Sequence, residues 1–127
     1  MVESPPKEDL PPNLQLGPQI LISAGQTKTA KEIIFRKCKF DVVVDGKSDT
    51  IYLATSDPQF ITPEKLKVGM KFSQIPLEFR ENMQKENGWG YYVPLKSNWN
   101  VGFCEGISCT DQDLTDHSEI KWIFKRK

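Results

Sequence analysis

Histidine is almost absent from this chain, since His117 is the only one among 127 residues. A catalytic triad places a histidine between a nucleophile and a carboxylate, whereas His117 lies in the polar stretch "TDHSE", which is typical of a solvated loop. Three cysteines and this one histidine also lack the four-ligand pattern of a zinc site. The sequence therefore predicts no catalytic histidine and no zinc centre.

Phosphate-binding and calcium-binding loops are missing as well. The glycines of "GWG" and "VG" lack the spacing and the lysine of a phosphate-binding loop. The stretch 111–119, "DQDLTDHSE", is acidic but has no glycine where a calcium loop turns. We interpret it as a solvated acidic loop, and we expect no catalytic, cofactor-binding or metal-binding residue and no enzyme activity.

The chain also lacks an excess of either charge, with 17 lysines and arginines against 17 acidic residues. Binding to nucleic acid or to an anionic membrane needs a basic surface, which this balance does not provide. No apolar run approaches the roughly 18 residues of a membrane span. We expect a protein partner, no nucleic acid and no transmembrane segment in this chain.

Proline, in contrast, is concentrated near the N-terminus, where residues 1–18 hold more than half of the nine prolines. Such a segment buries too little apolar surface to fold, which predicts a disordered, semi-rigid tether. Residues 19–127 then form a single α+β domain. Met1 is not followed by a signal-peptide pattern, so either the protein is cytosolic, or a signal has been removed and a lipid anchor belongs upstream.

Alternating apolar residues predict strands in the first half of the domain. The stretch "IIFRKCKFDVVVDG" at 33–46 is the clearest predicted strand, and from 36 to 42 Cys38 and Phe40 share one face while polar residues share the other, which is the period of a half-buried strand. Asp45-Gly46 begins a turn, and "TIYLATS" at 50–56 returns as the partner strand. Further predictions are a strand at 19–25 and a turn at 26–32.

One helix is predicted, over residues 73–86. Ser73 is a good N-cap, Ile75, Phe79 and Met83 repeat every four residues, and Gly88 is a suitable C-terminal cap. Three more strands are expected at 89–95, 99–104 and 119–126. The predicted fold class is therefore α+β: an antiparallel sheet of about five or six strands with one main helix packed on one face.

Five aromatic residues gather between positions 87 and 103. Four of them alternate so that they point to one face beneath the expected helix, and they predict core packing: Trp89, Tyr91, Trp99 and Phe103. Tyr92 lies on the opposite face beside Asn100. We predict these two as partner-binding residues, with further contacts from the loop 105–118.

The three cysteines have different expected roles. Cys38 lies in a strand-like alternation and is expected to pack as a small apolar residue. Cys104 and Cys109 bracket "EGIS", a segment short enough for a disulfide if the geometry allows it. Two reduced thiols at these positions are the alternative.

The stretch "YLATSDPQFITPEKLKVGMKFSQI" resembles small envelope proteins and lipoproteins related to the β-lactamase-inhibitor-protein fold, including the outer-membrane assembly lipoprotein group. The matching residues are Phe60, Thr62, Pro63, Val68 and Gly69, followed by Phe72 and Ile75. Lys65 stands where many of these sequences have a glycine. The resemblance implies a domain that binds proteins or serves as an accessory of the envelope, with no catalyst among the matching residues.

We therefore expect a non-enzymatic protein-binding or accessory domain of the bacterial envelope or the secreted space: periplasmic, anchored to the outer membrane, or secreted. The alternative is a cytosolic immunity or inhibitor protein, in which Cys104 and Cys109 stay reduced. A third hypothesis is a carbohydrate-binding module that uses the aromatic residues as a platform.

Overall fold

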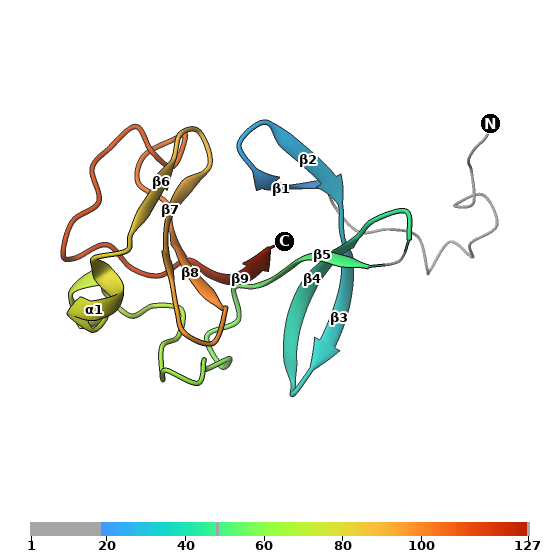
Figure 1. Ribbon diagram of the computed structural model, residues 1–127, viewed down its shortest axis with the longest axis horizontal. Helices are drawn as coiled ribbons and strands as arrows, with labels where there is room; N and C mark the ends of the chain where they lie inside the picture. The colour runs from blue at the N-terminus through green and yellow to red at the C-terminus, as the bar shows by residue number, and fades with distance from the viewer. Residues whose placement is uncertain (1–18, 48, 127) are drawn as a thin grey trace.

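The computed structural model describes residues 19–47 and 49–126, and this part of the chain folds into nine strands in two antiparallel sheets (Figure 1). The smaller sheet pairs β1 (Gln19–Ser23) with β2 (Gln26–Thr29). The larger sheet has the order β3-β4-β5-β9-β8-β7-β6. Its strands are β3 (Lys31–Phe35), β4 (Cys38–Val44), β5 (Thr50–Thr55), β6 (Gln84–Glu86), β7 (Gly90–Pro94), β8 (Asn100–Phe103) and β9 (Trp122–Arg126).

The predicted main helix is wrong, and so is the α+β fold class, because the chain is mostly β. Residues 72–86 form a 3-10 turn η3 (Phe72–Gln74), a single helical turn α1 (Leu77–Arg80) and then strand β6. Ile75 is extended with ψ of 133° because it precedes Pro76, which disfavours helical backbone at the preceding residue. Residues 84–86, which follow α1, form strand β6 and pair with β7 instead of continuing a helix.

Gly88 closes a hairpin rather than capping a helix. It has φ of +80°, and the amide of Trp89 donates to the carbonyl of Glu86 at 2.9 Å. Asn-Gly is a strong signal for a tight hairpin, and here the pairing across the sheet overrides the helical spacing of the residues before it.

The continuous strand predicted from Ile33 onward is interrupted by a turn at Arg36 and Lys37. Arg36 and Lys37 have φ of 53° and 67°, and Phe35 pairs with Cys38. Two successive left-handed residues make the tight turn that fits the twist of a hairpin. The chain before the turn is a separate edge strand, β3, rather than the first part of one continuous strand, and the stretch predicted as a turn at 26–32 contains β2 and the start of β3.

Both faces of the larger sheet are covered. The loop-covered face, which includes Phe40, Val101 and Ile123, packs against the connection between β5 and β6. The hairpin-covered face, which includes Tyr52 and Phe124, packs under the β1–β2 hairpin. Central β9 contributes to both cores, because its consecutive residues Ile123 and Phe124 point in opposite directions and are both fully buried.

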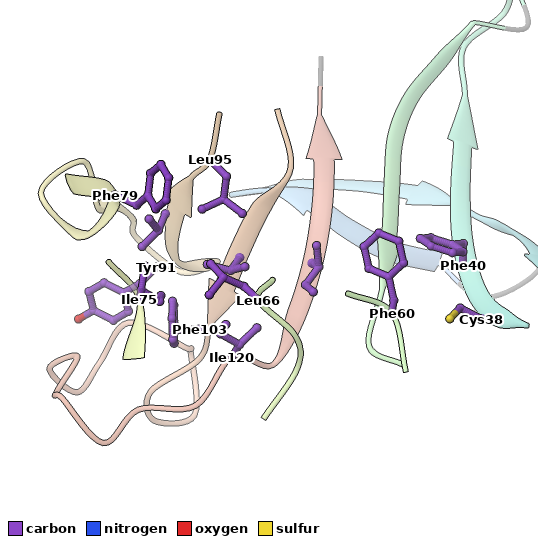
Figure 2. Packing of buried hydrophobic residues seen from close by; sticks show 13 residues of the cluster. Cys38, Phe40, Phe60, Leu66, Ile75, Phe79, Tyr91, Leu95, Phe103 and Ile120 are labelled. Carbon is purple, nitrogen blue, oxygen red and sulfur yellow. The ribbon is translucent and has the colours of Figure 1, made fainter. Parts of the chain in front are cut away.

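The core of the loop-covered face extends along the sheet. Figure 2 shows Phe40 beside Phe60 at one end and Phe79, Ile75 and Tyr91 grouped at the other. The rings of Phe40 and Phe60 meet edge to face with centroids 5.2 Å apart. Ile75 and Phe79 are therefore buried as predicted, although a 3-10 turn and one helical turn replace the long helix.

Two further predictions concern the N-terminal segment and membrane-spanning helices. The tether predicted for residues 1–18 lies outside the described residues. Within the described part of the chain, no helix is both long enough and apolar enough to cross a bilayer.

Candidate partner-binding surface

Tyr92 and Asn100 share the hairpin-covered face, but their polar groups are used within the molecule. The Tyr92 ring packs edge-on against Phe124, with centroids 5.6 Å apart, and its hydroxyl accepts a hydrogen bond from Arg126 at 3.3 Å. Asn100 Nδ2 donates to the carbonyl of Phe124 at 3.2 Å. Both side chains are half-buried, so their role in partner binding stays a prediction that this arrangement does not favour.

The aromatic residues near these two are mainly core. Tyr91 and Phe103 belong to the loop-covered core, and Trp99 packs against its margin. Trp89, which we expected on the same face, lies in the opposite core because it occupies the turn before β7. Its indole N–H donates to the carbonyl of Leu21 at 2.8 Å and so fastens the β1–β2 hairpin.

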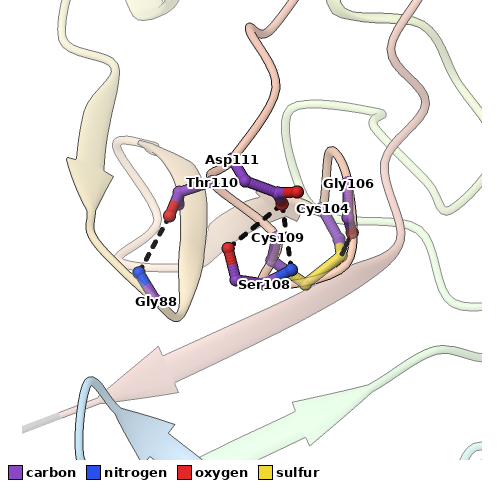
Figure 3. Close-up of a disulfide and its surroundings, with 7 residues drawn as sticks. All are labelled: Gly88, Cys104, Gly106, Ser108, Cys109, Thr110 and Asp111. Atoms are coloured by element: carbon purple, nitrogen blue, oxygen red, sulfur yellow. Dashed lines mark hydrogen bonds between the residues drawn. A yellow bond between two sulfur atoms is a disulfide. The ribbon is translucent and has the colours of Figure 1, made fainter.

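Cys104 and Cys109 form a disulfide with Cα atoms 4.0 Å apart (Figure 3). The backbone N–H of Ser108 and its hydroxyl both donate to Asp111 Oδ1, at 2.9 Å and 3.0 Å. These bonds hold the pKa of Asp111 below its ordinary value. The closed loop leaves Ile107 99% exposed. Cys38 is a free, buried thiol, and burial raises its pKa.

The acidic stretch 111–119 gives no coordination site in the structure. In residues 19–47 and 49–126, no group of three or more histidine, cysteine or acidic side chains is arranged to hold a metal ion. His117 is exposed, and its backbone N–H donates to Thr115 Oγ1 at 3.2 Å.

Three exposed apolar side chains lie next to one another on the edge strand β3, which the sequence pattern predicts only as part of a longer strand. All five of its residues are exposed, and Ile33, Ile34 and Phe35 have exposed fractions of 44%, 72% and 52%. The strand ends the larger sheet, and among the described residues no strand pairs with its outer side (Figure 1). It therefore presents backbone donors and acceptors together with apolar side chains.

An apolar hollow of about 210 Å³ adjoins β3 on the loop-covered face. Ile33 and Phe35 form its outer wall, and more deeply buried side chains form the rest. Its full lining is apolar: Ile33, Phe35, Phe40, Leu53 and Trp99. A hollow of this kind next to a free strand edge suits an apolar side chain from an extended peptide.

A recess of about 340 Å³ adjoins β3 on the hairpin-covered face. It holds three carboxylates and one ammonium, and its lining is Glu32, Lys39, Asp41, Ser56 and Asp57. Lys39 Nζ lies 3.0 Å from Glu32 Oε2. Burial, and then the charge of Glu32, raise the pKa of Asp41. The edge strand is thus flanked by an apolar surface on one face and a net negative surface on the other.

The sequence carries no specific signal for this site. The run "IIF" at 33–35 directly precedes two basic residues, Arg36 and Lys37, but "WIF" at 122–124 precedes Lys125 and Arg126 in the same way and forms buried strand β9. The alternating pattern joins residues 33–35 to the strand that follows, so it does not identify them as an edge.

Comparisons with known proteins leave the function open. No family model matches the chain, and no curated protein matches it. It is similar in structure to the uncharacterized protein YfeY from Escherichia coli, with a TM-score of 0.50 and 14% sequence identity over 77% of this chain and 80% of that chain. At this identity the likeness concerns the fold alone, and the link to small envelope lipoproteins remains the resemblance described above.

Proposed function

We propose that this chain is a non-enzymatic protein-binding domain that takes up an extended segment of a partner as an additional strand along β3. The observation that carries the proposal is the edge of β3, with which no further described strand pairs and whose five residues are all exposed although three are large and apolar. Soluble proteins ordinarily protect such an edge. An added strand pairs its backbone groups and covers its apolar side chains at the same time.

The proposed working compartment is the bacterial envelope or the secreted space. The disulfide between Cys104 and Cys109 supports an oxidising compartment. The alternative, a cytosolic immunity or inhibitor protein, uses the same edge but keeps both thiols reduced. Intact mass of protein purified without reductant from native cells separates the two, because the disulfide form is lighter by two hydrogens.

A peptide that alternates leucine and threonine tests strand addition directly. We expect the amide NMR signals of residues 31–35 to shift on titration, because new backbone hydrogen bonds form there. The control peptide has the same sequence with every second amide N-methylated, which removes ladder donors and should abolish the shifts. Equal shifts with both peptides would show apolar contact without strand addition.

Matched protein variants locate the site. Ile33→Lys places a charge on the edge and should remove binding, as edge lysines do in natural sheets. Leu77→Lys is the control because Leu77 is 60% exposed on α1, away from β3. Binding that survives Ile33→Lys, or that is lost equally in both variants, contradicts the proposal.

A further inference from the structure

We infer that the partner segment alternates apolar side chains with basic ones, a selectivity that rests on the proposed strand addition. The inference comes from the different character of the two surfaces that flank β3. It specifies the partner's chemistry at each face, whereas strand addition alone specifies only an extended backbone.

The alternation follows from strand geometry. Ile33 pairs with Phe40 and therefore lies on the loop-covered face, while Glu32 pairs with Asp41 and lies on the hairpin-covered face. Side chains of neighbouring strands that lie opposite each other point to the same face. Successive residues of an added strand therefore point alternately to the apolar hollow and to the acidic recess.

On the loop-covered face, the hollow selects an apolar side chain. A residue opposite Ile33 or Phe35 lies about 4.8 Å from β3, at the spacing of adjacent strands. Its side chain contacts the exposed parts of these two residues and leans toward Trp99. The hollow has no polar lining, so a charged side chain placed there loses solvation without gaining a partner.

On the hairpin-covered face, the recess selects a positive charge. The three carboxylates of Glu32, Asp41 and Asp57 exceed the single ammonium of Lys39, which already pairs with Glu32. At Asp41, burial and the charge of Glu32 raise the pKa more than the charge of Lys39 lowers it. Arginine or lysine opposite Glu32 can lay its aliphatic stem over exposed Ile34 and direct its charge toward Asp41. An acidic side chain there is repelled.

The test compares peptides that differ only in the residues facing the recess. The neutral reference alternates leucine with threonine, the basic peptide replaces threonine by arginine, and the acidic peptide replaces it by glutamate. We expect the basic peptide to bind at least about 10-fold more tightly than the acidic one at low ionic strength, with the preference falling as salt is added. Dissociation constants come from NMR titration of the full chain.

Charge-removing variants assign the preference to the recess. Glu32→Gln combined with Asp41→Asn should reduce the ratio between basic and acidic peptides to within about 3-fold, while the neutral peptide binds as before. The control combines Asp113→Asn with Asp116→Asn, two exposed carboxylates of the loop 105–118. This control removes the same charge elsewhere, so it should leave most of the preference intact.

The outcomes separate the two proposals. If all peptides shift residues 31–35 with equal affinity, strand addition stands and the alternating selectivity is wrong. If the preference persists in the Glu32 and Asp41 variant, the recess does not cause it and the inference also fails. If no peptide shifts β3, strand addition itself fails. Sedimentation of the free protein tests a second copy as occupant, and a dimer broken by Ile33→Lys would overturn a heterologous partner segment.

Discussion

Arg126 Nη2 lies 2.9 Å from Glu86 Oε2, which joins central strand β9 to the opposite edge strand β6. Nη1 of Arg126 donates to the carbonyl of Ile22 at 2.9 Å. The guanidinium carbon Cζ lies 4.6 Å from the centroid of the Trp89 ring. The two charged side chains are only 20% and 23% exposed. Arg126 therefore fastens the β1–β2 hairpin to the sheet.

Replacing Arg126 by methionine should lower the free energy of unfolding by about 2–3 kcal/mol, because the half-buried Glu86 carboxylate loses its cationic partner and the carbonyl of Ile22 loses a charged donor. Urea unfolding followed by tryptophan fluorescence measures the change. Lys39→Met is the matched control, because the Lys39–Glu32 pair is exposed on both sides. Equal losses in the two variants would show that Arg126 has no special structural role.

The features predicted correctly from sequence are those in which short-range signals and the fold agree. The β4–β5 connection turns at Asp45, whose carboxylate accepts the backbone N–H of Lys47 at 2.8 Å, as expected of aspartate in a turn. The short turn at 96–98 joins β7 to β8, and Val101 and Phe103 are core residues as predicted.

The failures arise at two tight hairpin turns where residue periodicity favours a continuous helix or strand. Ile75 and Phe79 have helical spacing, and both are buried, so this spacing outweighed the hairpin signal of Asn87-Gly88, which joins residues 84–86 to β7. The β3–β4 turn was missed because Arg36 and Lys37 adopt left-handed backbone that ordinarily favours glycine or asparagine. The candidate site was missed for the same reason, since the edge strand exists only because of that turn.

Phe79 and Leu77 lie in the same helical turn but in opposite environments. Phe79 is 9% exposed in the loop-covered core, and Leu77 is 60% exposed. Phe79→Ala should cost about 3–4 kcal/mol of unfolding free energy, since a buried phenylalanine is lost, while Leu77→Ala should stay within about 0.5 kcal/mol. Urea unfolding of the two variants checks this, and similar costs would mean that α1 does not pack as described.

The disulfide should contribute a modest part of the stability. It closes a short loop, so replacing both Cys104 and Cys109 by alanine should lower the unfolding free energy by about 2 kcal/mol in the chain-entropy account. Cys38 serves as the internal reference, because it is buried with a raised thiol pKa. It should react with iodoacetamide only in denaturant, and peptide mapping by mass spectrometry distinguishes the three cysteines. Rapid alkylation of Cys38 in native protein would contradict its placement in the core.

Glu64 makes stability depend on pH through the turn at 96–98. Its carboxylate accepts the backbone N–H of Ser97 at 2.7 Å and the Ser97 hydroxyl at 2.9 Å. Burial opposes ionisation of Glu64, but these hydrogen bonds outweigh it and hold its pKa below the ordinary value of 4.5. A carboxyl group with a lowered pKa in the folded state stabilises the protein above its unfolded-state pKa, and this contribution is lost as pH falls through the folded-state value.

Glu64→Gln should therefore lower the free energy of unfolding by about 1 kcal/mol at neutral pH, a figure that allows for solvent screening of this partly exposed group. The difference from the unmodified protein should shrink as pH falls below 4.5, because the carboxyl group that is replaced then becomes neutral in both states. Urea unfolding across this pH range measures it, with Glu119→Gln as the exposed control. A difference that stays constant with pH would show that Glu64 acts through shape rather than through its charge.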